Sequence, residues 1–211
     1  MISKRFAVGR QLVLPMHLLN TPPNLPGANF NQPAAVQLTF ARSTGGGWTG
    51  LGQKTNVVSA GVSLVADRNT QWLYYMPGDI SHIPFNGVDV LTGKMSGCPL
   101  VVFRLAGVVH AGHIGTRDGD AVGNAAVLAT WNNWATANAG DVIAGYYPAA
   151  AWPTMPRGNL GHGWGILGLM TAGHHHFYSI VIYATGQPNE WRVAGLRKRP
   201  TLTVAQLQNL A

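Results

Sequence analysis

The chain has 211 residues and a formal net charge of +7, which arises from 14 lysines and arginines against 7 acidic residues. This length suits one well-filled hydrophobic core, so we expect a single domain over residues 1–211. Only 10% of the residues are charged, and the basic ones are scattered except for Arg197-Lys198-Arg199. We therefore expect a surface suited to an acidic protein partner, with no nucleic-acid platform.

The sequence also disfavours disulfide bonding, membrane insertion and secretion. Its single cysteine, Cys98, excludes an intramolecular disulfide. No run approaches the roughly 18 apolar residues that a membrane helix needs. The N-terminal stretch MISKRFAVGRQLVLPMHLLN resembles a signal peptide in its basic and apolar parts, but Pro15 and His17 interrupt it and no cleavage site follows. We expect no signal peptide and no membrane association.

Along the first half of the chain, alternating apolar residues predict strands. A loop rich in proline and asparagine over residues 20–34 precedes a strand at 35–43. Two further strands, 55–67 and 70–76, are expected to be joined by a short polar turn. Residues 99–103 and 108–114 are expected to form a hairpin around a four-residue loop, 104–107.

The second half begins with a helical pattern. Between Asp120 and Asn138, apolar residues recur at helical spacing, with Asp118 or Asp120 as N-cap and Gly140 as stop; these residues are Val127, Leu128, Trp131, Trp134 and Ala135. Strands are expected at 177–184 and 190–196, and Thr203 with Gln206 predicts a capping box on a short final helix. The predicted fold is α+β, with layered mixed or antiparallel β-sheets flanked by helices and long loops.

The stretch MSGCPLVVFRLAGVVHAGHIGT, residues 95–116, holds the cysteine. If Phe103 pairs with Val108, Cys98 lies opposite His113, with Cβ atoms about 5 Å apart, and His110 points to the other face. An imidazole beside a thiol favours the thiolate, a nucleophile for carbonyl carbon. Backbone N–H groups at Ser96 and Gly97 could then hold an oxyanion. The alternative is that Cys98 is a small buried hydrophobic residue.

This stretch resembles the catalytic hairpin of the cytotoxic necrotizing factor family of glutamine deamidases. In that family, a Ser-Gly-Cys motif supplies the nucleophile and a His-x-Gly-Thr motif ends the second strand. Cys98 and His113 match without a gap, as do Gly107, Gly115 and Thr116. Met95 stands where the family usually has leucine, a change that conserves volume. The resemblance is confined to this hairpin.

The resemblance implies a fold like the family's catalytic domain and a role for each site residue. Cys98 is expected to be the nucleophile and His113 the general base and acid. In the single-domain Burkholderia lethal factor type, a threonine before the cysteine orients the histidine, and Thr92 occupies that position. The cysteine-to-histidine spacing of this type would select His110 instead, so His110 stays an alternative.

The resemblance also implies a biological role. The chain is expected to be a monomeric bacterial toxin without a cofactor, which acts in the host cytoplasm on a host protein. The length of the chain favours the target of the single-domain type, translation initiation factor 4A, with inhibition of host translation. A Rho GTPase is the alternative substrate. Segments 77–97 and 148–163, rich in glycine and proline, are expected to form the rim of the substrate site.

Two other function classes remain open. One is another cysteine hydrolase, such as a papain-like protease, but there the cysteine normally begins a helix, and PLVVF after Cys98 reads as a strand. The other is a binding module with an inert cysteine. A metal site is not expected, because His174, His175 and His176 are consecutive, point to alternating faces of a strand and have no acidic neighbours. The tryptophans Trp72, Trp131, Trp134 and Trp164 are expected in the core.

Overall fold

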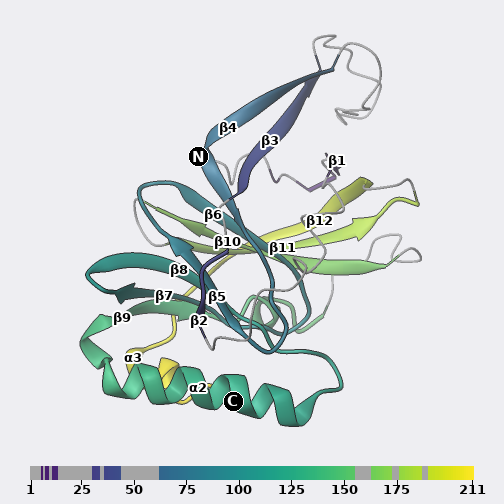
Figure 1. Ribbon diagram of the computed structural model, residues 1–211. Coiled ribbons are helices and arrows are strands. Elements are labelled where there is room, and N and C mark those ends of the chain that lie inside the picture. The colour runs from purple at the N-terminus through teal and green to yellow at the C-terminus, as the bar shows by residue number, and fades with distance from the viewer. Residues whose placement is uncertain are drawn as a thin grey trace.

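The computed structural model describes residues 6, 8–9, 11–13, 30–33, 36–43, 62–154, 163–172, 176–186 and 190–211. These residues form two β-sheets and a few helices, in three layers (Figure 1). The predicted α+β class, with mixed sheets and few helices, is therefore confirmed. No helix in these ranges is long and apolar enough to cross a lipid bilayer.

The large sheet has seven strands within the described ranges, and all neighbours pair antiparallel except β6 and β4, which are parallel. In spatial order they are β1 (Gln11–Val13), β12 (Glu190–Arg199), β11 (His176–Ala184), β10 (Trp164–Thr171), β6 (Asp89–Met95), β4 (Val62–Leu73) and β3 (Val36–Ser43). The adjacent antiparallel strands β11 and β12 confirm the strand pair predicted near the C-terminus.

The small sheet has five strands in the described part of the chain, with a parallel pair only at its β2 edge. In spatial order they are β2 (Phe30–Asn31), β5 (Ile80–Pro84), β8 (Val108–Ile114), β7 (Leu100–Leu105) and β9 (Val142–Tyr146). The predicted hairpin of the cysteine segment is its β7–β8 pair.

Helix α2 (Ala121–Ala137) lies along the outer side of the small sheet, and α3 (Val204–Leu207) lies beside it (Figure 1). The Asp120 carboxylate accepts the Gly123 N–H at 2.9 Å and begins α2 as predicted. Thr203 and Gln206 form the predicted capping box of α3. Two short 3₁₀ turns, η2 (Ala139–Asp141) and η3 (Ala149–Ala151), complete the helical part described.

Apolar side chains fill the space on both sides of the small sheet. Leu100 and Val102 of β7 face the large sheet and belong to the inter-sheet core with Tyr146. Val101 and Phe103 face the other way and pack on α2. The burial of Trp131 confirms the apolar stripe predicted for that helix. Residues two apart on a strand therefore share a layer, which decides which site residues can meet.

Two expectations for the first half of the chain are wrong. Residues 62–73 form one continuous strand, β4, where a turn was expected between 67 and 70. The polar residues Asp67, Arg68 and Asn69 continue the strand, because β4 pairs with β3 before them and with β6 after them. Segment 77–97, expected to be a loop at the substrate rim, contains the largely buried strands β5 and β6. Residues 55–61 and 155–162 lie outside the described ranges.

Candidate active site

The turn between β7 and β8 fixes the register of the hairpin. Ala106 and Gly107, with φ of 49° and 80°, form a two-residue turn, so Leu105 pairs with Val108 and Leu100 pairs with His113. The predicted pairing of Phe103 with Val108 is therefore wrong by two residues, and Cys98 does not lie directly opposite His113. An even shift leaves every side chain on its predicted face.

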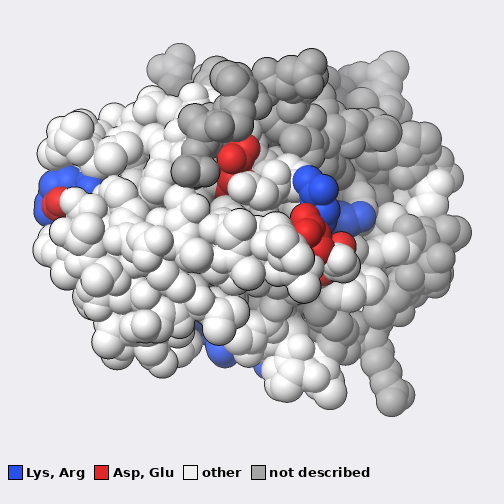
Figure 2. Space-filling view, turned by 60° about the horizontal axis from the view of Figure 1, so that its bottom comes forward, with Lys and Arg blue, Asp and Glu red and all other residues white. Residues whose placement is uncertain are grey.

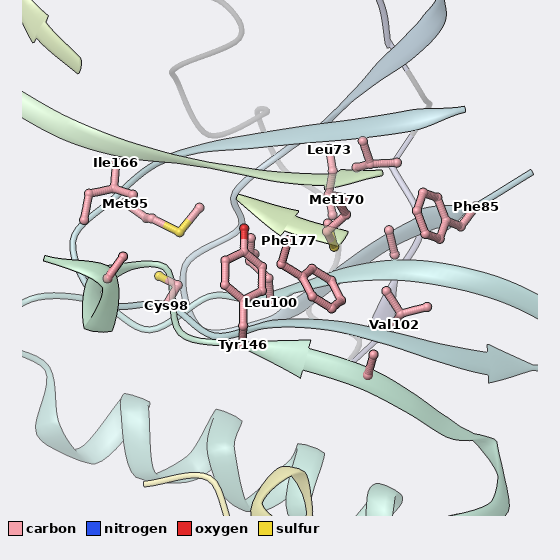
Figure 3. Close-up of a cluster of buried hydrophobic side chains, with 14 of the residues drawn as sticks. Leu73, Phe85, Met95, Cys98, Leu100, Val102, Tyr146, Ile166, Met170 and Phe177 are labelled. Carbon is pink, nitrogen blue, oxygen red and sulfur yellow. The ribbon is translucent and has the colours of Figure 1, made fainter. Parts of the chain in front are cut away.

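Cys98 lies at one end of the inter-sheet core, near Met95, with Phe85 at the other end (Figure 3). Its side chain is 3% exposed. The sulfur makes two contacts with one residue, because the Thr116 hydroxyl donates to Cys98 Sγ at 3.3 Å and the thiol donates to the Thr116 carbonyl at 3.3 Å. The resting thiol is thus held by Thr116.

Burial raises the pKa of the Cys98 thiol above its ordinary value. Hydrogen bonds with Thr116 and with the Gly97 backbone lower the pKa, and the negative charge of Asp118 raises it. Burial is the largest of these effects, so Cys98 rests as a neutral thiol at neutral pH.

His113 lies in the same layer and is fully buried. Its Nδ1 is hydrogen-bonded to Thr92 Oγ1 at 2.7 Å. Thr92 is a buried residue of β6 and pairs with Gly168 in the large sheet, so this bond joins the two sheets. Among the described residues, His113 Nε2 has no hydrogen-bond partner. Burial lowers the pKa of His113 to about 3, so the ring is neutral at neutral pH.

Ser96 and Gly97 lie in the short segment that precedes Cys98. The Ser96 hydroxyl donates to both carboxylate oxygens of Asp118, at 2.9 and 3.0 Å, and this contact ties the segment before Cys98 to the segment after β8. Of the two, Gly97 is the residue whose backbone is hydrogen-bonded to Cys98. The backbone N–H groups of Ser96 and Gly97 both remain candidates for the oxyanion site, and the Ser96 side chain closes the loop.

The alternative histidine, His110, is in the other layer. It pairs with Phe103, stacks on that ring at 5.9 Å between centroids, and faces α2. Its Nδ1 is hydrogen-bonded to Nδ1 of His82 at 2.9 Å. The structure thus brings Thr92 and His113 together on the cysteine's side of the sheet and leaves His110 on the opposite side.

Tyr75 is a neighbour of the site that sequence reasoning missed. Its hydroxyl donates to the Thr116 carbonyl at 2.8 Å, and its ring centroid lies 5.2 Å from that of His113. Burial and the nearby Cys98 raise the pKa of Tyr75 to about 12, so it is a neutral donor. Tyr75 follows β4, far from the hairpin in sequence, and no local pattern indicates its role.

The residues of this site suit thiol chemistry rather than metal binding. Within the described ranges, no three His, Cys, Asp or Glu side chains are grouped so that they could hold a metal ion. His176 is the first residue of β11, whereas His174 and His175 lie outside the described residues. The described residues of the site are one thiol, one neutral imidazole whose Nε2 has no hydrogen-bond partner among them, and one hydroxyl that orients the imidazole.

Comparison of the chain with family models, curated proteins and solved structures finds no match in any of the three.

Proposed function

We propose that the chain is a cysteine-dependent protein-glutamine deamidase. The observation that supports this most is the Thr92–His113 hydrogen bond of 2.7 Å, which fixes the imidazole on the cysteine's side of the small sheet. In the tautomer with its proton on Nδ1, His113 donates to Thr92 and keeps a lone pair on Nε2, which has no partner among the described residues. That nitrogen is the base the reaction needs.

The reaction has two balanced halves. Cys98 gives its proton to His113 Nε2, and the sulfur attacks the carbonyl carbon of a glutamine side chain. The imidazolium then donates this proton to the amide nitrogen, the C–N bond breaks, and ammonia leaves a thioester. Water attacks the thioester while His113 takes one of its protons, the C–S bond breaks, and the proton returns to sulfur. The sum is glutamine and water to glutamate and ammonia.

The resting site is neutral, which sets the order of events. Burial raises the pKa of Cys98 and lowers that of His113, so Cys98 rests as a thiol hydrogen-bonded to Thr116 and His113 rests as a neutral imidazole. The proton moves when the substrate carbonyl arrives and the developing oxyanion is stabilised by backbone N–H groups at Ser96 and Gly97. The loop closed by Ser96 and Asp118 has to admit the glutamine, because Cys98 is 3% exposed.

The substrate class is carried over from the resemblance, and the orienting threonine agrees with it. A threonine hydroxyl in this position is the arrangement that the resemblance associates with the single-domain Burkholderia lethal factor type. We therefore place translation initiation factor 4A first among host substrates, with arrest of host translation in the cytoplasm as the consequence, and a Rho GTPase second. No cofactor takes part in this chemistry.

A binding module with an inert cysteine is the second candidate, and the burial of Cys98 favours it. A papain-like enzyme is disfavoured because Cys98 precedes a strand, β7, and no helix begins there to lower the thiol pKa. The inert module predicts no chemical change in any partner protein, and this separates it from the deamidase.

The first prediction concerns the product. Purified factor 4A and a Rho GTPase are incubated separately with the wild-type chain and with Cys98→Ser, and each is analysed by intact mass and peptide mapping. The wild-type chain should add about 1 Da at one glutamine, and Cys98→Ser should add none, because a hydroxyl is a far poorer nucleophile at neutral pH. Modification of Rho alone would overturn the choice of substrate. Equal activity of both chains would overturn the mechanism.

A further inference from the structure

Thr116 contacts the cysteine through two different atoms. Its hydroxyl donates to Cys98 Sγ, and its carbonyl accepts the thiol proton, each at 3.3 Å. The hydrogen bond from the Thr116 hydroxyl lowers the pKa of Cys98, because a donor to sulfur stabilises the thiolate. When the proton leaves the sulfur, the first contact strengthens and the second disappears.

The end of β8 and the connection between β4 and β5 fix Thr116 in place. The Tyr75 hydroxyl donates to the Thr116 carbonyl at 2.8 Å, and the Thr116 N–H donates to the Ile114 carbonyl at 3.0 Å. The preceding residue, Gly115, exchanges backbone hydrogen bonds with Gly78 at 2.7 Å and with Asp79 at 2.8 Å. The Thr116 hydroxyl is therefore presented to the sulfur by a braced backbone and not by a free loop.

We propose that Thr116 is a positioning residue that holds the Cys98 sulfur and stabilises its thiolate during attack. The catalytic meaning of this role rests on the proposed deamidase function, whereas the effect on ionisation does not. The unpartnered Nε2 of His113 takes the proton that now points to the Thr116 carbonyl. The Thr116 hydroxyl then keeps its bond to the negatively charged sulfur.

The other charged and titratable groups around Cys98 act differently. Asp118, on the segment after β8, disfavours the thiolate by its negative charge. Tyr75, which follows β4, and His113 of β8 are both neutral at neutral pH. The positive charge of Arg117 lowers the pKa of Tyr75. Of the side chains that affect Cys98, Thr116 is the one whose hydrogen bond favours the thiolate.

The test compares Thr116→Val, which removes the hydroxyl and keeps the carbonyl and the shape, with Thr116→Ser, which restores the hydroxyl. Because Cys98 is the only cysteine, labelling cysteine Cβ with carbon-13 gives one NMR signal that reports its ionisation. We expect the titration of Thr116→Val to move upward by about one pH unit, a tenfold loss of thiolate at fixed pH. Thr116→Ser should superimpose on wild type.

Thr171→Val is the matched control, because Thr171 makes its hydrogen bonds with His176 at the β10–β11 turn. It should leave the cysteine titration unchanged. Thermal unfolding of all variants checks that they are folded. A Thr116→Val curve that coincides with wild type overturns the proposal, as does a serine variant that matches the valine variant. The expected shift without any deamidation by the wild-type chain supports the role of Thr116 and refutes the proposed function.

Discussion

At the scale of single residues, the two candidate histidines differ in their surroundings more than in their sequence. His113 is hydrogen-bonded to the Thr92 hydroxyl through Nδ1, and its Nε2 has no hydrogen-bond partner in the described part of the chain. His110 is hydrogen-bonded to the His82 imidazole and stacked on the Phe103 ring. A base needs a free lone pair on the side of the nucleophile. His113 lies on the cysteine's side of the small sheet, whereas His110 lies on the opposite side.

The second prediction follows from this difference. His113→Ala should abolish deamidation, because the thiol loses its proton acceptor, whereas His110→Ala should reduce folding stability and keep turnover. Removing one partner of the buried His82–His110 pair leaves the other nitrogen unsatisfied, at a cost of about 1–3 kcal/mol. Rates at a temperature where both variants are folded, with urea unfolding beside them, make the comparison. Loss of turnover in His110→Ala with full activity in His113→Ala would reverse the assignment.

At the scale of elements, close backbone approach explains one residue of the His-x-Gly-Thr match. A Cβ on Gly115 would collide with the Met76 carbonyl and would lie 3.0 Å from the Asp79 carbonyl oxygen. Both carbonyls belong to the backbone of the turn that leads into β5, which cannot move away easily. Gly115 is thus required for the contact that holds Thr116 beside Cys98.

The third prediction is that Gly115→Ala destabilises the fold by about 1–3 kcal/mol, because the added methyl group overfills a packed contact. Gly140→Ala is the control, since a Cβ at Gly140 meets nothing within 4 Å. Urea unfolding measures both free energies. The expectation fails if the two alanine variants are equally stable.

Elements with a clear local signal were predictable from the sequence. Helix α2 combines an apolar stripe with the Asp120 cap, and α3 has its Thr203 capping box. Strands β5, β6 and β10 were missed because both faces of each are largely buried, which removes the alternation of apolar and polar residues. Burial on both faces is a property of the layers and leaves only a short apolar run in the sequence.

The site was predictable only in part, for similar reasons. The side of the sheet shared by Cys98 and His113 follows from strand periodicity, which tolerates an even error in register. The register itself was wrong because Ala106 adopts a positive φ, which alanine rarely does, and the loop is shorter than expected. The contacts of Tyr75 and Thr116 with the site depend on how the sheets pack, which no motif encodes.

At the scale of the whole molecule, charge is sparse. Figure 2 shows a face that is mostly uncharged, with lysine, arginine and acidic side chains in a few small groups. One such contact is Arg104 with Asp141 at 3.4 Å, and both side chains are 43% exposed. An exposed pair of this kind contributes little to stability. The response of the fold to pH should therefore come from buried groups rather than from the surface.

Three buried histidines dominate that response. Burial lowers the pKa of His113 to about 3 and of His82 to about 4 from an ordinary value of 6.5, and it lowers the pKa of His110 as well. Below pH 6.5 the unfolded chain binds protons that the folded chain does not bind, so the free energy of unfolding falls as the pH falls. The contribution is fully present above pH 6.5 and is lost progressively down to the folded pKa values.

The last prediction concerns how steeply the free energy of unfolding falls as the pH is lowered. His113 and His82, which stay neutral in the fold, each contribute about 1.36 kcal/mol per pH unit below their unfolded pKa, or about 2.7 kcal/mol per pH unit together, and His110 adds to this in the same direction. Urea unfolding measures this slope between pH 4.5 and 7, a range that lies on both sides of the ordinary histidine pKa of 6.5. The double variant His82→Leu/His110→Leu removes two of the three titrating groups without leaving either nitrogen unpaired, so its slope should fall to about half of the wild-type slope or less. The same slope in both chains would show that the His82–His110 pair binds protons in the folded state. A free energy of unfolding that does not change with pH in the wild-type chain would show that His113 also binds a proton in the folded state.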